Sequence, residues 1–267
     1  MENNKQILDT NKKRLLDTNK LIMTGLMMAL VTIATMIFVI PVPFTSGYIH
    51  LGDSMIFISV FILGYKYGAV ASGVGSALAD IFVGYANWAP WTLCIKGMMA
   101  LLMGLAIEKS LKSKKNLVLI SLVTAGLWAV FNFTVHYIVG INASSNPKQL
   151  LTDDVTTLSA LGELVNKVQS QLMLFALLIP VFLIIISIYF RKKDILIIKG
   201  YQILAMTLAG LFMVFGYYIA GGIMYGNFAV SAFSIPWNMV QFLMGFIIAM
   251  LITGALLKTP AKKFFVY

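Results

Sequence analysis

Apolar residues gather into eight runs along the chain, and short polar segments separate these runs. Most runs approach the ~20 residues that a helix needs to cross a bilayer. No stretch alternates with the period of two that marks the strands of a membrane barrel. The pattern therefore predicts an all-α, polytopic membrane helix bundle with about eight apolar segments. These are 21–42, 54–64, 69–86, 92–108, 116–140, 171–190, 201–223 and 237–257.

The second and third runs are short, and the segment 64–68 between them begins and ends with glycine. Glycines in that arrangement indicate a tight turn. We therefore expect either two short spans or a hairpin, with the chain returning to the side of the membrane that it left. The longest polar stretch, at about 141–170, is predicted to be an outer loop that carries a short surface helix.

The positions of Lys and Arg predict the orientation, because cytoplasmic segments of membrane proteins are enriched in both. With the N-terminus inside and eight crossings, 17 of the 20 basic residues face the cytoplasm. A single long helix over 54–86 would instead place the lysines of 109–115 outside. The charge pattern favours eight crossings with both termini in the cytoplasm.

Composition agrees with a membrane protein, since 60% of the residues are hydrophobic and only 11% are charged. Soluble domains carry roughly 25% charged residues. The net charge of +10 could indicate nucleic acid, but the basic residues flank apolar runs, so we expect the lipid bilayer and no nucleic acid as a partner. Cys94 is the sole cysteine, which excludes an internal disulfide, and we expect it to be a buried packing residue.

Three regions are expected: a basic cytoplasmic leader over 1–20, a single membrane domain over 21–258 and a cytoplasmic tail over 259–267. No polar segment is long enough to fold as a separate soluble domain. The Gly-x-x-x-x-Gly-Lys-Ser/Thr loop that binds nucleotide phosphates is absent from the sequence. If the protein uses ATP, another chain must hydrolyse it.

Charged residues are rare inside the apolar runs: Asp53 begins the second, Asp80 lies in the third and Lys96 lies in the fourth. Each costs roughly 2.5–3.5 kcal/mol on membrane-insertion scales. Lys96 could pair with either aspartate simply to be tolerated in lipid, or it could belong to a pocket for a small polar ligand. We favour the pocket, because uncharged polar residues gather at the same membrane level. The partner of Lys96 (Asp53, Asp80 or the ligand) stays open.

Aromatic and polar residues cluster at the outer ends of several runs, which is typical of a small-molecule pocket. Trp88 and Trp237 fit such a pocket and an interfacial aromatic belt equally well. The two histidines, His50 and His136, do not have metal-site spacing, and no nucleophilic triad is evident. We therefore expect no enzyme, no metal and no cofactor in this chain. The substrate-binding candidates from these residues are His50, Asp53, Asp80, Asn87, Trp91, Lys96, Asn238 and Gln241.

Six short segments together resemble the S component, the substrate-binding subunit of energy-coupling factor (ECF) vitamin transporters, and most closely its riboflavin-type branch. The resemblance covers about 20–110 and 200–258. The segments are GYIHLGD (47–53), LGYKYG (63–68), GSALADI (75–81), APWTLCIKG (89–97), GYY (216–218) and SIPWNMVQ (234–241).

This resemblance implies a six-helix core that binds a vitamin on the outer side of a bacterial plasma membrane. It implies a transmembrane coupling subunit and two ATPase subunits as partners, and the ATPases would use the ATP. Gly25 and Ala29 match the face that contacts the coupling subunit, and 42–52 matches a lid over the pocket. The resemblance also implies that Lys96, Asn238, Gln241 and a ninth substrate-binding candidate, Tyr217, face the pocket. Residues 111–199 depart from the family pattern as an inserted helix pair with an outer loop, which leaves 21–110 and 200–258 as the core.

The leading hypothesis is a membrane subunit that binds a small vitamin or precursor with a pyridine or pyrimidine ring, of the vitamin B6 or hydroxymethylpyrimidine type. Riboflavin is the alternative substrate. A second hypothesis is an ion-coupled secondary transporter that uses Asp53, Asp80 and Lys96 as a relay. A third is a membrane scaffold that transports nothing.

Overall fold

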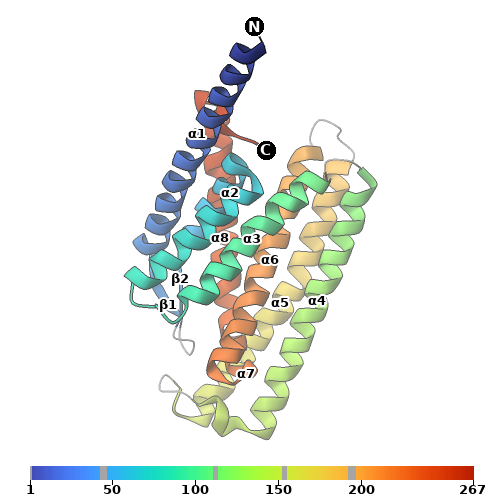
Figure 1. Cartoon of the computed structure of the whole chain (residues 1–267). Helices are drawn as coiled ribbons and strands as arrows, with labels where there is room; N and C mark the ends of the chain where they lie inside the picture. The colour runs from blue at the N-terminus through green and yellow to red at the C-terminus, as the bar shows by residue number, and fades with distance from the viewer. Residues whose placement is uncertain (1, 43–46, 111–113, 152–154, 192–196) are drawn as a thin grey trace.

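A computed structural model describes residues 2–42, 47–110, 114–151, 155–191 and 197–267, and within these the fold is almost entirely helical (Figure 1). The long helices are α1 (Glu2–Ile37), α2 (Gly52–Phe82), α3 (Ala89–Ser110), α4 (Lys114–Ser145), α5 (Leu158–Arg191), α6 (Ile197–Tyr225) and α8 (Ile235–Leu256). The short elements are β1 (Ile40–Val42), β2 (Gly47–Ile49), η1 (Pro147–Leu150), α7 (Phe228–Ser231), η3 (Ala232–Ser234) and η4 (Pro260–Phe264).

Helix α2 is a hairpin of two limbs, 52–63 and 65–82. Gly64 has a φ of 73° and a ψ of −179°, which no helix contains and which glycine adopts without a Cβ clash. A Cβ on Gly68 would lie 3.1 Å from the Cα of Val60. In a continuous helix, residues eight apart are separated by about 12 Å. The chain therefore reverses at Gly64, as the sequence predicted for this segment.

The bundle makes eight passes between its two ends. The described residues contain seven helices that are long and apolar enough to cross a membrane, and α2 is one of them. Because α2 doubles back, the number of passes is one more than the number of helices. Both termini consequently lie at one end of the bundle, and the β-strands and α7 lie at the other (Figure 1). The prediction of an all-α polytopic membrane bundle is confirmed.

A small antiparallel β-hairpin, β1 with β2, joins α1 to α2 at the end away from the termini. The limb of α2 that follows it has only twelve residues, about 18 Å of helix against a hydrocarbon core of about 30 Å. The strand-to-helix junction at His50 therefore lies below the rim of the bundle. This depth makes room for a cavity above it.

Helices α1, α2 and α3 pack closely through small residues. The Thr32 hydroxyl in α1 bonds the Gly75 carbonyl oxygen of α2 over 2.8 Å. A Cβ on Gly73 would lie 2.8 Å from the Leu93 carbonyl oxygen of α3, so only glycine fits there. Small residues let membrane helices approach in this way.

Helices α4 and α5 pack mainly against each other and touch α6 and α8 over smaller areas. The predicted outer loop at 141–170 is wrong at both ends, because α4 continues to Ser145 and α5 already begins at Leu158. The N-terminal part of α5 contains polar residues such as Asn166 and Gln169. The prediction used polarity to mark the loop and therefore placed the start of this helix too late.

One further expectation is wrong. Cys94 is exposed on α3 and is not a buried packing residue, because its side of the helix faces away from the bundle. Helix α1 runs without interruption from Glu2 through the basic leader into the first apolar run.

Candidate functional site

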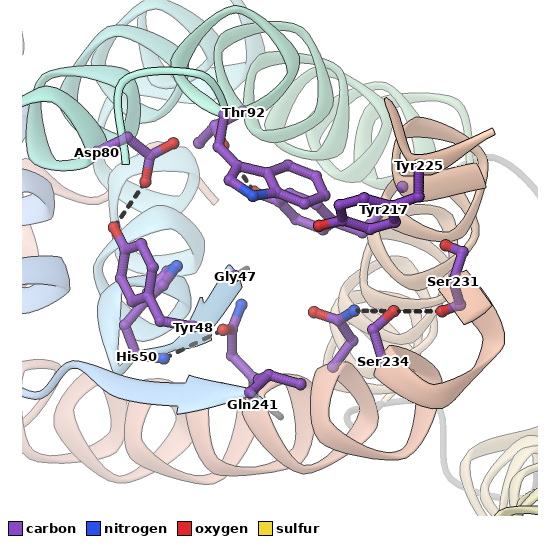
Figure 2. A pocket seen from close by; sticks show the side chains of 14 residues that line it. Gly47, Tyr48, His50, Asp80, Thr92, Tyr217, Tyr225, Ser231, Ser234 and Gln241 are labelled. Carbon is purple, nitrogen blue, oxygen red and sulfur yellow. Dashed lines mark hydrogen bonds between the residues drawn. The ribbon is translucent and has the colours of Figure 1, made fainter. Parts of the chain in front are cut away.

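A cavity of about 500 Å³ of empty space opens at the end of the bundle away from the termini. The β-hairpin, α2, α3, α6, α7 and α8 all contribute to its walls (Figure 2). The lining residues are Val42, Gly47, Tyr48, His50, Asp80, Trp88, Thr92, Tyr217, Gly221, Tyr225, Ser231, Ser234, Asn238 and Gln241.

One side of the cavity carries a carboxylate. Asp80, at the end of the second limb of α2, accepts a hydrogen bond of 2.6 Å at Oδ1 from the Tyr48 hydroxyl of β2 (Figure 2). Burial and the neighbouring carboxylate raise the pKa of Tyr48, so its phenol keeps its proton and donates. Thr92 of α3 faces the same carboxylate, and its Oγ1 accepts from the Tyr217 hydroxyl over 3.1 Å.

Aromatic rings form most of the remaining wall. Tyr48 packs on Tyr85 with ring centroids 4.6 Å apart, and Trp88 packs on Tyr217 and Tyr225 at 5.8 and 6.2 Å. Rings at these separations form favourable offset or edge-on pairs. A flat ring ligand would find aromatic surface on two opposite sides of the cavity (Figure 2).

A buried ion pair lies beneath the cavity. Lys96 of α3 bonds Asp53 of α2, and both side chains are fully buried. The other oxygen of Asp53 accepts from Gln241 Nε2 of α8 over 3.1 Å. Gln241 Oε1 in turn accepts from the backbone N–H of His50 over 3.1 Å. One chain of polar contacts thus ties α3, α2 and α8 to the end of the β-hairpin.

His50 is neutral, because burial and the nearby Lys96 charge lower its pKa to about 3. Its Nδ1 accepts a hydrogen bond of 3.0 Å from the backbone N–H of Gly52, which leaves the ring proton on Nε2. The ring lines the cavity as a donor at any physiological pH.

Five of the nine predicted substrate-binding residues line the cavity together. These are His50, Asp80, Tyr217, Asn238 and Gln241. Asp53 and Lys96 lie below it as the buried pair. Asp53 is therefore the partner of Lys96, which the sequence left open. Asn87 is exposed, and the partly buried Trp91 packs against the core and does not line the cavity.

Several lining residues were not among the predicted candidates, chiefly Tyr48, Trp88, Thr92, Tyr225 and the pair Ser231 and Ser234. A spacing of four could have pointed to two of them. Trp88, in the turn just before α3, and Thr92 and Lys96 on that helix follow one another at this interval, so they point to the same side. Trp91 lies on a different face, although it is near in sequence. Trp88 is 7% exposed, which fits a pocket wall better than an interfacial belt, and Trp237 is 38% exposed.

A family model described as ECF-type riboflavin transporter, S component, matches residues 15–183, more than half of the chain. The chain belongs to this family. It is therefore an S component of an ECF-type vitamin transporter family and a multi-pass membrane protein. The match continues through α4 and into α5, which are the helices that the sequence pattern suggested were inserted.

The chain is also similar to a curated protein of Pyrococcus woesei described as "Uncharacterized protein in gap 3'region". The two are 46% identical over 74 residues, which is 28% of this chain and 49% of that protein. The chain thus matches about half the length of this relative. No solved structure matches this S component.

Proposed function

We propose that the chain is the substrate-binding membrane subunit of an ECF-type uptake system and that it takes a small water-soluble vitamin or precursor into the cavity from outside. The observation that carries this proposal is the aromatic-walled polar cavity at the end of the bundle opposite both termini. The S-component family supplies the transport context.

The proposed orientation puts both termini in the cytoplasm, with the cavity facing outward. The positive-inside rule supports it, because 17 of the 20 Lys and Arg residues fall on the side of the termini in an eight-pass topology. Labelling Cys94→Ser variants with single new cysteines at Lys148 and Lys258 tests it. Only the cysteine at 148 should react with an impermeant maleimide in intact cells, and reaction at 258 alone would reverse the orientation.

The proposed substrate is a compound with a pyridine or pyrimidine ring, of the vitamin B6 or hydroxymethylpyrimidine type. Stacking surfaces from Tyr48, Trp88 and Tyr217 suit one flat ring, and Asp80, Asn238 and Gln241 supply hydrogen bonds to its edge. Riboflavin is the second candidate, because the family model carries its name.

Isothermal titration of the purified protein in lipid nanodiscs tests the substrate. Pyridoxine, hydroxymethylpyrimidine and riboflavin should each be titrated, and one of them should bind at micromolar concentration or tighter with one site per chain. A Ser234→Phe variant, which fills the cavity, should abolish that heat, whereas Ser170→Phe on an exposed face of α5 should keep it. If folded protein binds none of the three, the substrate proposal fails.

The proposed partners are a transmembrane coupling subunit and two ATPase subunits. In this proposal the ATPase subunits hydrolyse the ATP, and the chain itself is neither an enzyme nor a cofactor-binding protein. Gly25 and Ala29 lie exposed on α1, and nothing lies within 4 Å of a Cβ placed on Gly25, so this small-residue face is open to a partner helix. Gly25→Leu should lower co-purification with the coupling subunit at least ~tenfold if the face is used in that way.

An ion-coupled secondary transporter is the competing hypothesis from the same residues. The buried Lys96 and Asp53 neutralise each other and lie beneath the cavity, which favours a structural role for this pair. Uptake by vesicles that contain the chain alone, driven by a proton or sodium gradient, would support ion coupling. Uptake only with the coupling subunit, the ATPases and ATP would exclude it.

A further inference from the structure

The Asp80 carboxylate has one oxygen left over. Oδ1 accepts from Tyr48, but Oδ2 has no hydrogen-bond partner, although Asp80 is only 3% exposed. Five buried side-chain polar atoms lack a partner among the described residues, and Asp80 Oδ2 alone among these five belongs to a residue that lines the cavity. Buried acceptors without partners are rare and need an explanation.

The residues around Asp80 do not remove this open position. The Thr92 hydroxyl faces the carboxylate and can donate to it, but no hydrogen bond from it reaches Oδ2. The Lys96 amine is bonded to Asp53. The remaining groups near the carboxylate are the rings of Tyr48 and Tyr217. Asp80 therefore shares the cavity wall with the rings of Tyr48 and Tyr217 and keeps one acceptor position open (Figure 2).

We propose that Asp80 Oδ2 accepts a hydrogen bond from an N–H group on the ring edge of the ligand, so that this site selects heteroaromatic compounds with an amino substituent or a protonated ring nitrogen. This inference rests on the proposed function, since it concerns the ligand of the same cavity. It narrows the substrate class from nitrogen heterocycles in general to those that present a donor to a carboxylate.

The chemistry of a carboxylate explains the selection. An ionised Asp only accepts hydrogen bonds, and bonds to a charged acceptor are the stronger ones. An aminopyrimidine edge offers N–H groups without an adjacent carbonyl. The pyrimidine-dione edge of riboflavin places a carbonyl oxygen on each side of its single N–H, and those oxygens would repel Asp80. A site that is built to bond a donor also rejects the analogue that lacks it.

The test compares two probes that differ by one donor: 4-amino-5-hydroxymethyl-2-methylpyrimidine and the same compound without the amino group. Both are titrated into the full chain in nanodiscs, together with riboflavin, and the titrations are repeated with Asp80→Asn. Glu163→Gln, the same carboxylate-to-amide change on an exposed position of α5, is the matched control.

The inference predicts that wild type and Glu163→Gln bind the amino probe at least ~tenfold more tightly than the probe without it, which corresponds to ~1.4 kcal/mol. In Asp80→Asn this preference should shrink to less than ~threefold, because the amide nitrogen turns a donor toward the ligand. The wild-type comparison needs no variant, so the test holds even if Asp80→Asn does not fold.

Other outcomes separate the two proposals. Equal binding of both pyrimidines to wild type, or riboflavin binding that Asp80→Asn leaves unchanged, overturns the role of Asp80 and keeps the proposed function. Absence of binding to folded wild-type protein for these three probes and for pyridoxine overturns the proposed function and this inference with it.

Discussion

The cavity end of the core and the α4–α5 pair use buried polar groups in opposite ways. Around the cavity, hydrogen bonds join residues that are far apart in the chain: His50 with Gln241, Gln241 with Asp53 and Tyr217 with Thr92 are separated by 191, 188 and 125 positions. In the α4–α5 pair, the polar side chains bond within the pair. Trp128 donates to the Phe175 carbonyl and Gln169 to that of His136.

Apolar packing also separates the α4–α5 pair from the core. Between α5 and the core lies a cleft of about 800 Å³, lined by apolar side chains such as Phe175, Phe182 and Phe246 with one threonine among them. Helices α4 and α5 thus make most of their contacts with each other and fewer contacts with α6 and α8. The cavity, by contrast, exists only when β2, α2, α3, α6 and α8 are all in place, so equal substitutions should have unequal effects in the two regions.

The largest expected effect is that of Lys96→Met. It leaves the Asp53 carboxylate buried with Gln241 as its remaining partner, which should lower the free energy of unfolding by about 3–5 kcal/mol. Thermal unfolding in detergent measures the loss. The double variant Lys96→Met with Asp53→Asn should recover more than half of it, because no buried charge remains. A single variant as stable as the double one would contradict the account of the pair.

The next prediction compares two glutamine-to-leucine changes. Gln241→Leu removes the link between the ion pair and the β-hairpin and should weaken ligand binding by ~10–100-fold, or about 1.4–2.8 kcal/mol. Gln169→Leu removes one hydrogen bond inside the α4–α5 pair and should cost about 1 kcal/mol of stability. Its ligand affinity, by titration, should match wild type. Equal losses of ligand affinity in both variants would contradict the claim that only the cavity region affects binding.

Much of this contrast was foreseeable from sequence. Apolar runs and the positions of Lys and Arg predicted the helical bundle and the reversal at 64–68, because hydrophobic length and charge bias act locally. The rarity of Asp53, Asp80 and Lys96 inside apolar runs identified the region of the site. Five of the nine candidate residues line one cavity.

The remainder depended on the tertiary fold. The partner of Lys96 could not be read from sequence, since the Gly64 reversal brings Asp53 and Asp80, 27 positions apart, to the same end of the bundle. The sequence also did not show which side of α3 faces the cavity. The helix begins at Ala89, and with that start Trp88 and Thr92 line the cavity while Trp91 does not. Tyr48 was placed only within the lid segment 42–52, because its exact position follows from the pairing of β2 with β1.

A smaller effect is expected when single aromatic donors are removed. Tyr217→Phe deletes the bond to Thr92 at the cavity wall and should weaken ligand binding by about 3–10-fold, with stability lowered by less than ~1 kcal/mol. Trp128→Phe should do the reverse, with about 1 kcal/mol of stability lost and affinity unchanged. Titration and thermal unfolding of both variants test the pattern, and a loss of affinity in Trp128→Phe would break it.

The smallest effect belongs to the end of the bundle that holds the termini. The Tyr267 hydroxyl donates to Glu108 over 2.8 Å at an exposed site, and the reversal at Gly64 leaves the Phe61 carbonyl to accept from the Val266 N–H. Burial and Glu108 raise the pKa of Tyr267, so the bond should persist unchanged between pH 6 and pH 9. Tyr267→Phe should change stability by less than ~0.5 kcal/mol and leave binding alone. A larger change, or one that varies over this pH range, would contradict this.

The most direct measurement is native mass spectrometry of the protein purified in mild detergent from cells that make it. The account predicts one small bound molecule per chain, a nitrogen heteroaromatic compound of vitamin size. That molecule should be absent from Ser234→Phe and present in Ser170→Phe. A wild-type chain that carries no such molecule, or a Ser234→Phe chain that keeps it, would contradict the central claim that this cavity is the vitamin site.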